Sequence, residues 1–298
     1  MIGEFAALGA ALCWTVSAVL YKRALTKVSP VSANTVRCAG TSLVLIFALA
    51  LIGKIGVIAA LSARVLFLAC ASGIIGLGLG DTLYMLSLKT IGVSRAVPIT
   101  CTYPLFSLVW AFLFAGETIT PKVVLGAAAI VFGIWIISTS KMGETLEKSD
   151  EKLRLKGVVF AVLTAIAWSI SISMINLAVK ESQSLEQAYA VNTVRIMAVS
   201  VLLLFSSLAS MGKLGSLKVG LEDAVMLLAG GLVAIGLGWF LLAFSFTLIP
   251  ESQAVPISST TPLFSTLASL AFLHEKVTAK IALGSIVVVA GIFMVFAS

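Results

Sequence analysis

The chain has 298 residues, of which 60% are hydrophobic before its 24 glycines are counted, and only 11% are charged. Soluble domains carry about 25% charged residues, and a chain with so few polar side chains cannot cover its apolar surface in water. This composition excludes a soluble enzyme, a nucleic-acid-binding protein and a disordered chain, and it indicates an integral membrane protein. The net charge of +7 is therefore interpreted from the positions of the lysines and arginines.

Ten apolar stretches follow one another along the chain, each long enough to cross a bilayer as a helix. A spanning helix needs about 20 apolar residues, because the hydrocarbon core is about 30 Å thick. The stretches are apolar on all sides, whereas membrane β-strands alternate polar and apolar residues. We therefore predict an all-α integral membrane protein with ten transmembrane helices at residues 3–21, 31–52, 65–88, 94–115, 121–139, 157–179, 187–210, 223–248, 252–273 and 279–297.

The chain repeats itself at an offset of 158 residues. Residues 96–107 read AVPITCTYPLFS and residues 254–265 read AVPISSTTPLFS, with nine of the twelve positions identical. The first helices match at an offset of 154, which pairs Trp14 with Trp168. Further pairs at the offset of 158 are Arg37 with Arg195, Gly78 with Gly236, Gly80 with Gly238 and Glu117 with Glu275. Such a pattern indicates an internal duplication.

Two five-helix repeats are predicted, at residues 1–140 and 157–298, joined by a charged linker at residues 141–156. Since five is an odd number, the second repeat enters the membrane from the opposite side, and the repeats are inverted. Inverted repeats around a central cavity are the physical basis of alternating access, in which the cavity opens to either side in turn.

Lysines and arginines outside the predicted helices are divided unevenly between the two sides of the membrane. The side with the linker holds fourteen of the twenty, two lie within helices, and the side with both termini holds only Lys54, Arg64, Lys122 and Lys180. Cytoplasmic loops carry the excess of positive charge. We therefore predict a multi-pass protein of the plasma (inner) membrane with a cytoplasmic central loop and both termini outside.

Prolines and hydroxyl groups gather at equivalent positions in the fourth and ninth predicted helices. A proline within a helix frees the carbonyl four residues earlier, and unpaired backbone at membrane depth is tolerated only inside the protein or along a watery cavity. The residues predicted to line a substrate site there are Pro98, Thr100, Thr102, Tyr103, Pro256, Ser258, Ser259 and Thr260. Alternatively, the prolines only kink helices whose serines and threonines bond their own backbone.

Asp81 lies about 6 Å from the centre of the third predicted helix. An intramembrane carboxylate is costly, and by default it marks a substrate pathway, a proton relay or a partner cation. Its counterpart in the second repeat is Trp239, so the charge breaks the internal symmetry. We predict that Asp81, Tyr84 and Trp239 belong to the substrate site and that Asp81 couples transport to protons. The alternative is an ion pair with Lys22 or Lys89.

Two arginines and two tryptophans complete the candidate site. Arg37 and Arg195 lie about six to nine residues inside their helices, and we predict gating or anchoring roles for them rather than substrate contact. Trp14 and Trp168 are candidates for the substrate site, although interfacial packing is an equal alternative. Glu117 lies at a helix junction and is predicted to be structural.

Motifs of enzymes and metal sites are not found in the sequence. There is no P-loop, no His-rich cluster and no G-x-S-x-G elbow. We therefore predict no enzymatic activity, no metal and no cofactor.

The duplicated unit resembles the EamA-type carriers of the drug/metabolite transporter superfamily over essentially the whole chain. The resemblance is carried by the first-helix tryptophans, the second-helix arginines, the glycine-rich third helix, the proline-containing fourth helix and the patterns Glu117…Gly126…Gly133 and Glu275…Gly284…Gly291. It implies ten helices in inverted repeats around a central cavity, and secondary transport of small metabolites, often export. Related nucleotide-sugar carriers have cytoplasmic termini, in conflict with the charge count, whose orientation we keep.

We therefore predict a secondary active transporter that exports small polar metabolites, such as amino acids or drug-like compounds, by alternating access. The expected partners are a small-molecule substrate, the lipid bilayer and protons but no nucleic acid, and the protein is expected to be a monomer or homodimer. A membrane enzyme acting on a lipid-linked substrate is the first alternative, and a receptor or assembly factor without turnover is the second.

Overall fold

The computed structural model describes residues 1–24, 28–91, 96, 99–140, 151–181, 184–211, 219–264, 267 and 278–297. Every regular element within these ranges is helical, as predicted. The α-helices are α1 (Ile2–Ala24), α2 (Pro30–Leu51), α3 (Gly56–Ala59), α4 (Ala63–Ser72), α5 (Asp81–Ile91), α7 (Tyr103–Ala115), α8 (Pro121–Ser140), α9 (Glu151–Val179), α10 (Leu185–Met211), α11 (Leu221–Gly231), α12 (Trp239–Ser245), α13 (Glu251–Ser258) and α15 (Ala279–Phe296). Two further segments, η1 (Gly73–Gly80) and η3 (Leu232–Gly238), are π-helices.

Several helices begin or end at short-range signals in the sequence. The side chains of Ser29, Ser62 and Thr278 each accept a hydrogen bond from the backbone N–H three residues later. This contact satisfies one of the donors that the first turn of a helix leaves open. Pro30 follows Ser29 at the first helical position, where its missing N–H costs nothing. Gly116 ends α7 with a φ of 64°, a conformation that glycine adopts without steric strain.

The helix lengths agree with a multi-pass membrane protein. Six segments are long and apolar enough to cross a membrane: Ser32–Leu51, Ala63–Tyr84, Leu155–Val179, Leu185–Ser206, Leu221–Ser245 and Ala279–Phe296. Shorter apolar helices lie at Ile2–Ser17, Tyr103–Ala115 and Pro121–Ile137. The predicted ninth helix, 252–273, lies partly outside the described residues, so the count of ten transmembrane helices stays a prediction.

The distribution of side chains is the reverse of that in a water-soluble protein. Large apolar side chains such as Phe47, Phe112 and Phe293 are 63%, 63% and 70% exposed, whereas Arg195 and Glu251 are completely buried. Such an exterior suits lipid, and buried charges in a membrane protein face the interior of the bundle, where they find partners. The polar centre of the molecule is therefore the place to look for function.

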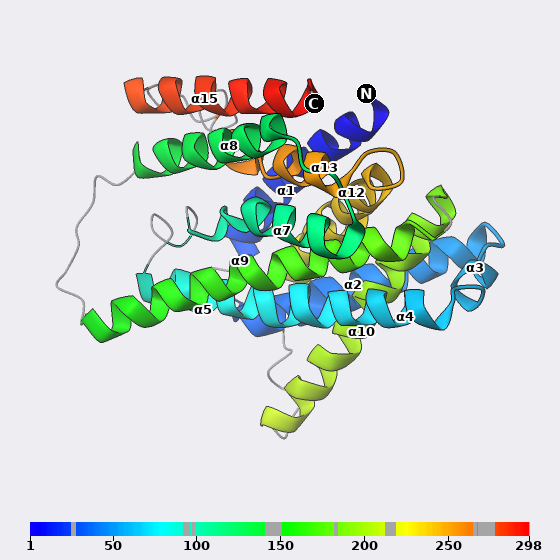
Figure 1. The fold of residues 1–298 in the computed structure, drawn as a ribbon. Helices are drawn as coiled ribbons and strands as arrows, with labels where there is room; N and C mark the ends of the chain where they lie inside the picture. The colour runs from blue at the N-terminus through cyan, green and yellow to red at the C-terminus, as the bar shows by residue number, and fades with distance from the viewer. Residues whose placement is uncertain are drawn as a thin grey trace.

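The first helix of each predicted repeat packs against helices of the other repeat. Helix α1 contacts α11, η3, α12 and α13, and α9 contacts α4, η1, α5 and α7. Figure 1 shows α9 as a long helix running beside α4, α5 and α7. The two halves are therefore interlocked rather than placed side by side.

Gly73 of the π-helix η1 and Gly231, the last residue of α11, allow close approach of the neighbouring helices. A Cβ atom on Gly73 would lie 2.2 Å from the Arg195 carbonyl oxygen, and one on Gly231 would lie 3.1 Å from the Arg37 carbonyl oxygen. These two contacts are equivalent under the offset of 158. At both positions the absence of a side chain lets two helix backbones come close together. The π-helical conformation of η1 and η3 was not predicted from the sequence.

Helices α8 and α15 form a pair at one edge of the molecule (Figure 1). A Cβ atom on Gly126 would lie 2.9 Å from the Gly291 carbonyl oxygen, and one on Gly133 would lie 2.7 Å from the Gly284 carbonyl oxygen. The earlier glycine of α8 thus faces the later glycine of α15, which means that the helices run in opposite directions. Their backbones touch because neither side has a side chain at these points.

Candidate functional site

Asp81 is held by residues from both halves of the chain. Its Oδ2 atom lies 2.6 Å from Nη2 of Arg37, and its Oδ1 atom accepts a hydrogen bond of 3.0 Å from Nε1 of Trp168. The Nε atom of Arg37 also donates to Oδ1 of Asn34 at 2.7 Å. Asp81 therefore forms an ion pair, but with Arg37 of the second helix. The side chains of Lys22 and Lys89, the alternative partners, lie outside the described part of the chain.

Trp168 brings three of the predicted site residues together. Besides its hydrogen bond to Asp81, its ring lies 5.2 Å from the ring of Tyr84 and 6.1 Å from the ring of Tyr103, measured between centroids. Each of these distances is typical of packed aromatic pairs. Trp168 of α9 thus links α5 and α7, the two elements that carry Asp81 and Tyr103.

Arg195 occupies the position equivalent to Arg37 but has different partners. Its guanidinium carbon lies 3.8 Å from the centre of the Trp239 ring, and it donates to the hydroxyls of Ser72 and Ser171 at 3.0 and 3.3 Å. Its Nη1 atom is buried without a hydrogen-bond partner. Trp239 is the counterpart of Asp81, so a cation–π contact replaces the ion pair in the second half.

Trp14 packs against Trp239, the ring that contacts Arg195. Its ring lies 5.2 Å from the ring of Trp239, and its Nε1 atom donates to the carbonyl of Ala234 at 3.2 Å. This carbonyl belongs to the π-helix η3, whose wider turn changes the local hydrogen-bonding pattern. Trp14 and Trp168 thus both meet the third helix of the opposite half, as their equivalent positions imply.

Four hydroxyls predicted to line the site in the fourth and ninth predicted helices bond to their own backbone in this conformation. Thr102 donates to the Ile99 carbonyl at 2.6 Å, and Ser258, Ser259 and Thr260 donate to carbonyls three residues earlier, at 3.0, 2.7 and 2.8 Å. Thr100 and Tyr103 are buried, Pro256 lies inside α13, and Pro98 lies outside the described residues. These bonds are the ones expected under the alternative reading, so a cavity lining stays a prediction.

A second buried carboxylate, Glu251, was missed by the sequence analysis. It is the first residue of α13, is completely buried, and accepts hydrogen bonds from the Ser173 hydroxyl and, at 2.8 Å, from Nδ2 of Asn176. In the sequence it stands directly after Ile249 and Pro250, where it looks like a polar residue of a short connection. Its counterpart in the first half is Val93, so the internal repeat does not indicate a functional carboxylate at this position either.

Glu117 binds the beginning of α13. Its two carboxylate oxygens accept hydrogen bonds from the backbone N–H groups of Glu251 and Ser252 at 2.9 and 3.0 Å, and Nζ of Lys180 lies 2.9 Å from one of them. Burial raises the pKa of the Glu117 carboxyl, but these hydrogen bonds outweigh burial and hold the pKa below its ordinary value of 4.5. Glu117 thus stays ionised and holds α13 to the end of α9.

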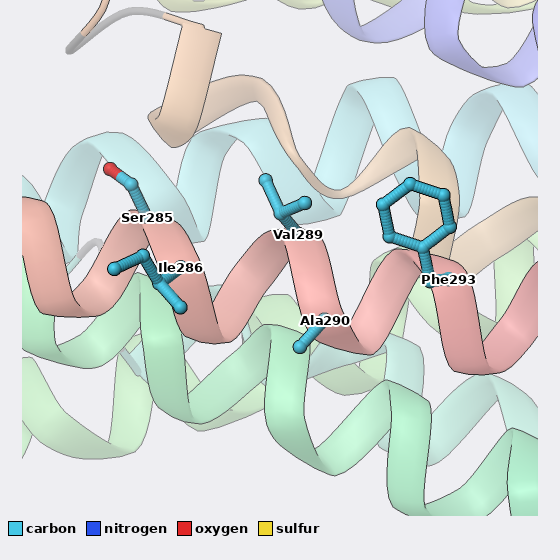
Figure 2. Close-up of a pocket in the computed structure, with 5 residues that line it drawn as sticks. All are labelled: Ser285, Ile286, Val289, Ala290 and Phe293. Carbon is cyan, nitrogen blue, oxygen red and sulfur yellow. The ribbon is translucent and has the colours of Figure 1, made fainter.

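A pocket on the outside of the protein lies away from these residues. It is lined by Ser285, Ile286, Val289, Ala290 and Phe293, which all belong to α15 (Figure 2). Ile286 and Phe293 are among the most exposed apolar side chains, and the wall carries a single hydroxyl. This pocket suits lipid chains, since one hydroxyl alone cannot fix the orientation of a polar substrate.

A helical chain with an apolar exterior and paired charges inside defines a multi-pass membrane protein. The sequence matches the EamA-like transporter family over residues 1–139 and 155–297, and the chain belongs to this family. It is therefore a membrane transporter, and the resemblance inferred from the residues is confirmed.

Known proteins of similar sequence and fold agree with this assignment. The chain is 24% identical over 294 residues to an uncharacterized transporter of Archaeoglobus fulgidus, covering 99% of this chain and 98% of that protein. It is 25% identical over 195 residues to the uncharacterized transporter YvbV of Bacillus subtilis, covering 64% of this chain and 59% of that one. A solved crystal structure has a TM-score of 0.80 at 16% identity and covers 99% of this chain and 97% of its own, which shows a shared fold.

Proposed function

We propose that the protein is a secondary active transporter that exports small polar metabolites, such as amino acids or drug-like compounds, by alternating access. Ten helices in two inverted repeats, residues 1–140 and 157–298, form the moving halves. The family supports transport, and the internal symmetry supports the mechanism.

One observation carries this proposal: equivalent contacts recur within the two halves, and another equivalent pair crosses between them. Nδ2 of Asn34 donates to the Leu77 carbonyl at 3.3 Å, and Nδ2 of Asn192 donates to the Ile235 carbonyl at 2.9 Å. A Cβ atom on Gly80 would lie 2.7 Å from Cδ1 of Trp168, and Gly238 has the equivalent neighbour, Trp14. Two interlocked units built from the same contacts can exchange conformations, so that one opens as the other closes.

The substrate site is proposed where the buried aromatic and polar side chains of both halves meet. The residues proposed to line it are Trp14, Asp81, Tyr84, Pro98, Thr100, Thr102, Tyr103, Trp168, Trp239, Pro256, Ser258, Ser259 and Thr260. Asp81 couples transport to protons in this proposal, because a proton on its carboxylate would release Arg37 to bind a substrate anion. Arg37 and Arg195 gate or anchor the two halves.

The proposed orientation places the linker 141–156 in the cytoplasm and both termini outside the inner membrane. Lys152, before the second repeat, and Lys54, on the opposite side, are both exposed. In intact cells a membrane-impermeant maleimide is expected to label Lys54→Cys and not Lys152→Cys. In inside-out vesicles the labelling is expected to reverse, and the opposite pattern in both preparations would show that the termini are cytoplasmic.

Counterflow in proteoliposomes tests the transport proposal. Vesicles preloaded with an unlabelled amino-acid mixture are expected to accumulate labelled amino acids transiently from outside, whereas protein-free vesicles are not. An enzyme or a receptor gives no such overshoot, so its absence at full reconstitution contradicts the proposal.

A matched pair of tryptophan variants tests the proposed site in the same assay. Trp168→Leu removes the contact with Asp81 and is expected to abolish the overshoot, whereas Trp135→Leu alters a half-exposed ring on the outside of α8 and is expected to preserve it. Equal activity of the two variants would place the substrate elsewhere.

A further inference from the structure

Glu251 lies in a polar cluster at the junction of α9 and α13, apart from the ion pair of Asp81. The carboxylate accepts hydrogen bonds from Ser173 and Asn176, which are both buried residues of α9. No ion pair of the described residues includes Glu251. The nearby cation Lys180 instead binds the carboxylate of Glu117.

Among the residues that the structure describes, the charged groups around Glu251 do not neutralise it. Glu117 and Lys180 act on its carboxyl with opposite signs, and they form a pair with each other. On the elements packed against α13, the other charged groups whose side chains are described are Glu4 of α1, which pairs with the N-terminal amino group, and the exposed Lys122 of α8 and Lys280 of α15. An ionised carboxylate buried without a cation is costly, and the cost is removed when the group binds a proton.

Asn176 offers a ready partner for that proton. Its Nδ2 atom donates to Glu251, whereas its Oδ1 atom is buried without a hydrogen-bond partner. Rotation of the amide by half a turn would point Oδ1 at the carboxyl and allow a protonated Glu251 to donate to it. The same two side chains can therefore pair in the ionised and in the neutral state of Glu251.

We propose that Glu251 is a second proton-binding site, which takes up and releases a proton during the transport cycle, with Ser173 and Asn176 as its switching partners. The proposal rests on the proposed transport function. The proton transfers between water and a carboxylate oxygen of Glu251, and no other bond changes.

Helix α9 connects this site with the other buried charges. Trp168 donates to Asp81, Ser171 accepts from Arg195, and Ser173 donates to Glu251. These three residues lie within five positions of one helix, or about 8 Å along its axis. A proton on Glu251 therefore changes the contacts of α9, the same helix whose Trp168 binds Asp81.

Infrared difference spectroscopy tests proton binding without any substrate. When reconstituted protein is taken from about pH 9 to about pH 5, the wild type is expected to gain carbonyl bands of buried protonated carboxyls, one of which is missing from Glu251→Gln and belongs to Glu251. The matched control Glu186→Gln removes a half-exposed surface carboxyl and is expected to keep that band.

Ser173→Ala keeps the carboxyl and removes one hydrogen-bond partner, so the band is expected to move in frequency. Ser173→Ala therefore tests the proposal even if Glu251→Gln does not fold. An unchanged band in either Glu251→Gln or Ser173→Ala would overturn the proposal.

Transport measurements distinguish this proposal from the proposed function. Glu251→Gln is expected to retain amino-acid counterflow but lose accumulation driven by a pH gradient, because exchange does not require a net proton movement. Full gradient-driven accumulation by Glu251→Gln would overturn the second proton site. A wild type without counterflow would instead contradict the transport function, while the infrared result still decides whether Glu251 binds a proton.

Discussion

Asp81→Asn is expected to lower the free energy of unfolding by about 3–5 kcal/mol, more than Arg37→Met does. The two side chains are only 12% and 15% exposed, so removing either leaves the other nearly buried and unpaired. An aspartate left alone can bind a proton, whereas an arginine keeps its charge at any accessible pH. The loss of Asp81 therefore leaves the buried guanidinium of Arg37 charged and without its carboxylate, whereas the loss of Arg37 leaves an aspartate that can become neutral.

Chemical unfolding in detergent, followed by circular dichroism, measures this difference. The double variant Asp81→Asn/Arg37→Met is expected to recover most of the stability lost in Asp81→Asn, because no buried charge remains. Glu181→Gln is the control, since Glu181 lies 3.9 Å from the exposed Arg64 and such surface pairs contribute about 0–1 kcal/mol. Equal destabilisation by the two single variants would show that the asymmetry of protonation has no effect on stability.

Gly73→Ala is expected to destabilise the fold by about 1–3 kcal/mol or more, through overpacking between η1 and α10. The new Cβ atom would lie 2.2 Å from the Arg195 carbonyl oxygen, which is backbone and cannot rotate away. The helices would have to separate, and the separation would disturb the hydrogen bond from Arg195 to Ser72, the residue directly before Gly73.

Gly78→Ala in the same π-helix is the matched control. Its Cβ atom would meet the nearest side chain, Leu202, at 3.6 Å, an ordinary van der Waals contact. Alanine also forms helices better than glycine by about 1 kcal/mol, so this variant is expected to be neutral or more stable. The midpoint of thermal unfolding in detergent compares the two, and a lower midpoint for Gly78→Ala than for Gly73→Ala would refute the packing argument.

The lengths of apolar stretches and the internal repeat made most of the fold predictable. Hydrophobic length alone located the helices, and the offset of 158 paired Arg37 with Arg195 before either had a position in space. The π-helices η1 and η3 were not predicted, because a run of glycine and aliphatic residues suits a π-helix and an α-helix equally well. Their conformation depends on the helices packed around them.

The contacts of the candidate site were harder to predict than its members. Asp81 was recognised because a carboxylate within an apolar helix is rare, but its partner Arg37 lies 44 positions earlier and is brought close only by tertiary packing. Glu251 was missed because it stands at the end of an apolar stretch, where a charged residue is ordinary. Only its burial against Ser173 and Asn176 shows that it differs from a surface acid.

The difference between the two arginine contacts bears on the direction of transport. If the two halves were identical, the inward-open and outward-open states of the proposed cycle would be related by a twofold rotation and have equal free energies, and the empty protein would populate them equally. Arg37 is bound by a carboxylate and Arg195 by an indole ring, so separating the two contacts costs different amounts of free energy. Under the proposed alternating access, the difference between Asp81 in one repeat and Trp239 in the other therefore favours one resting side of the unloaded transporter.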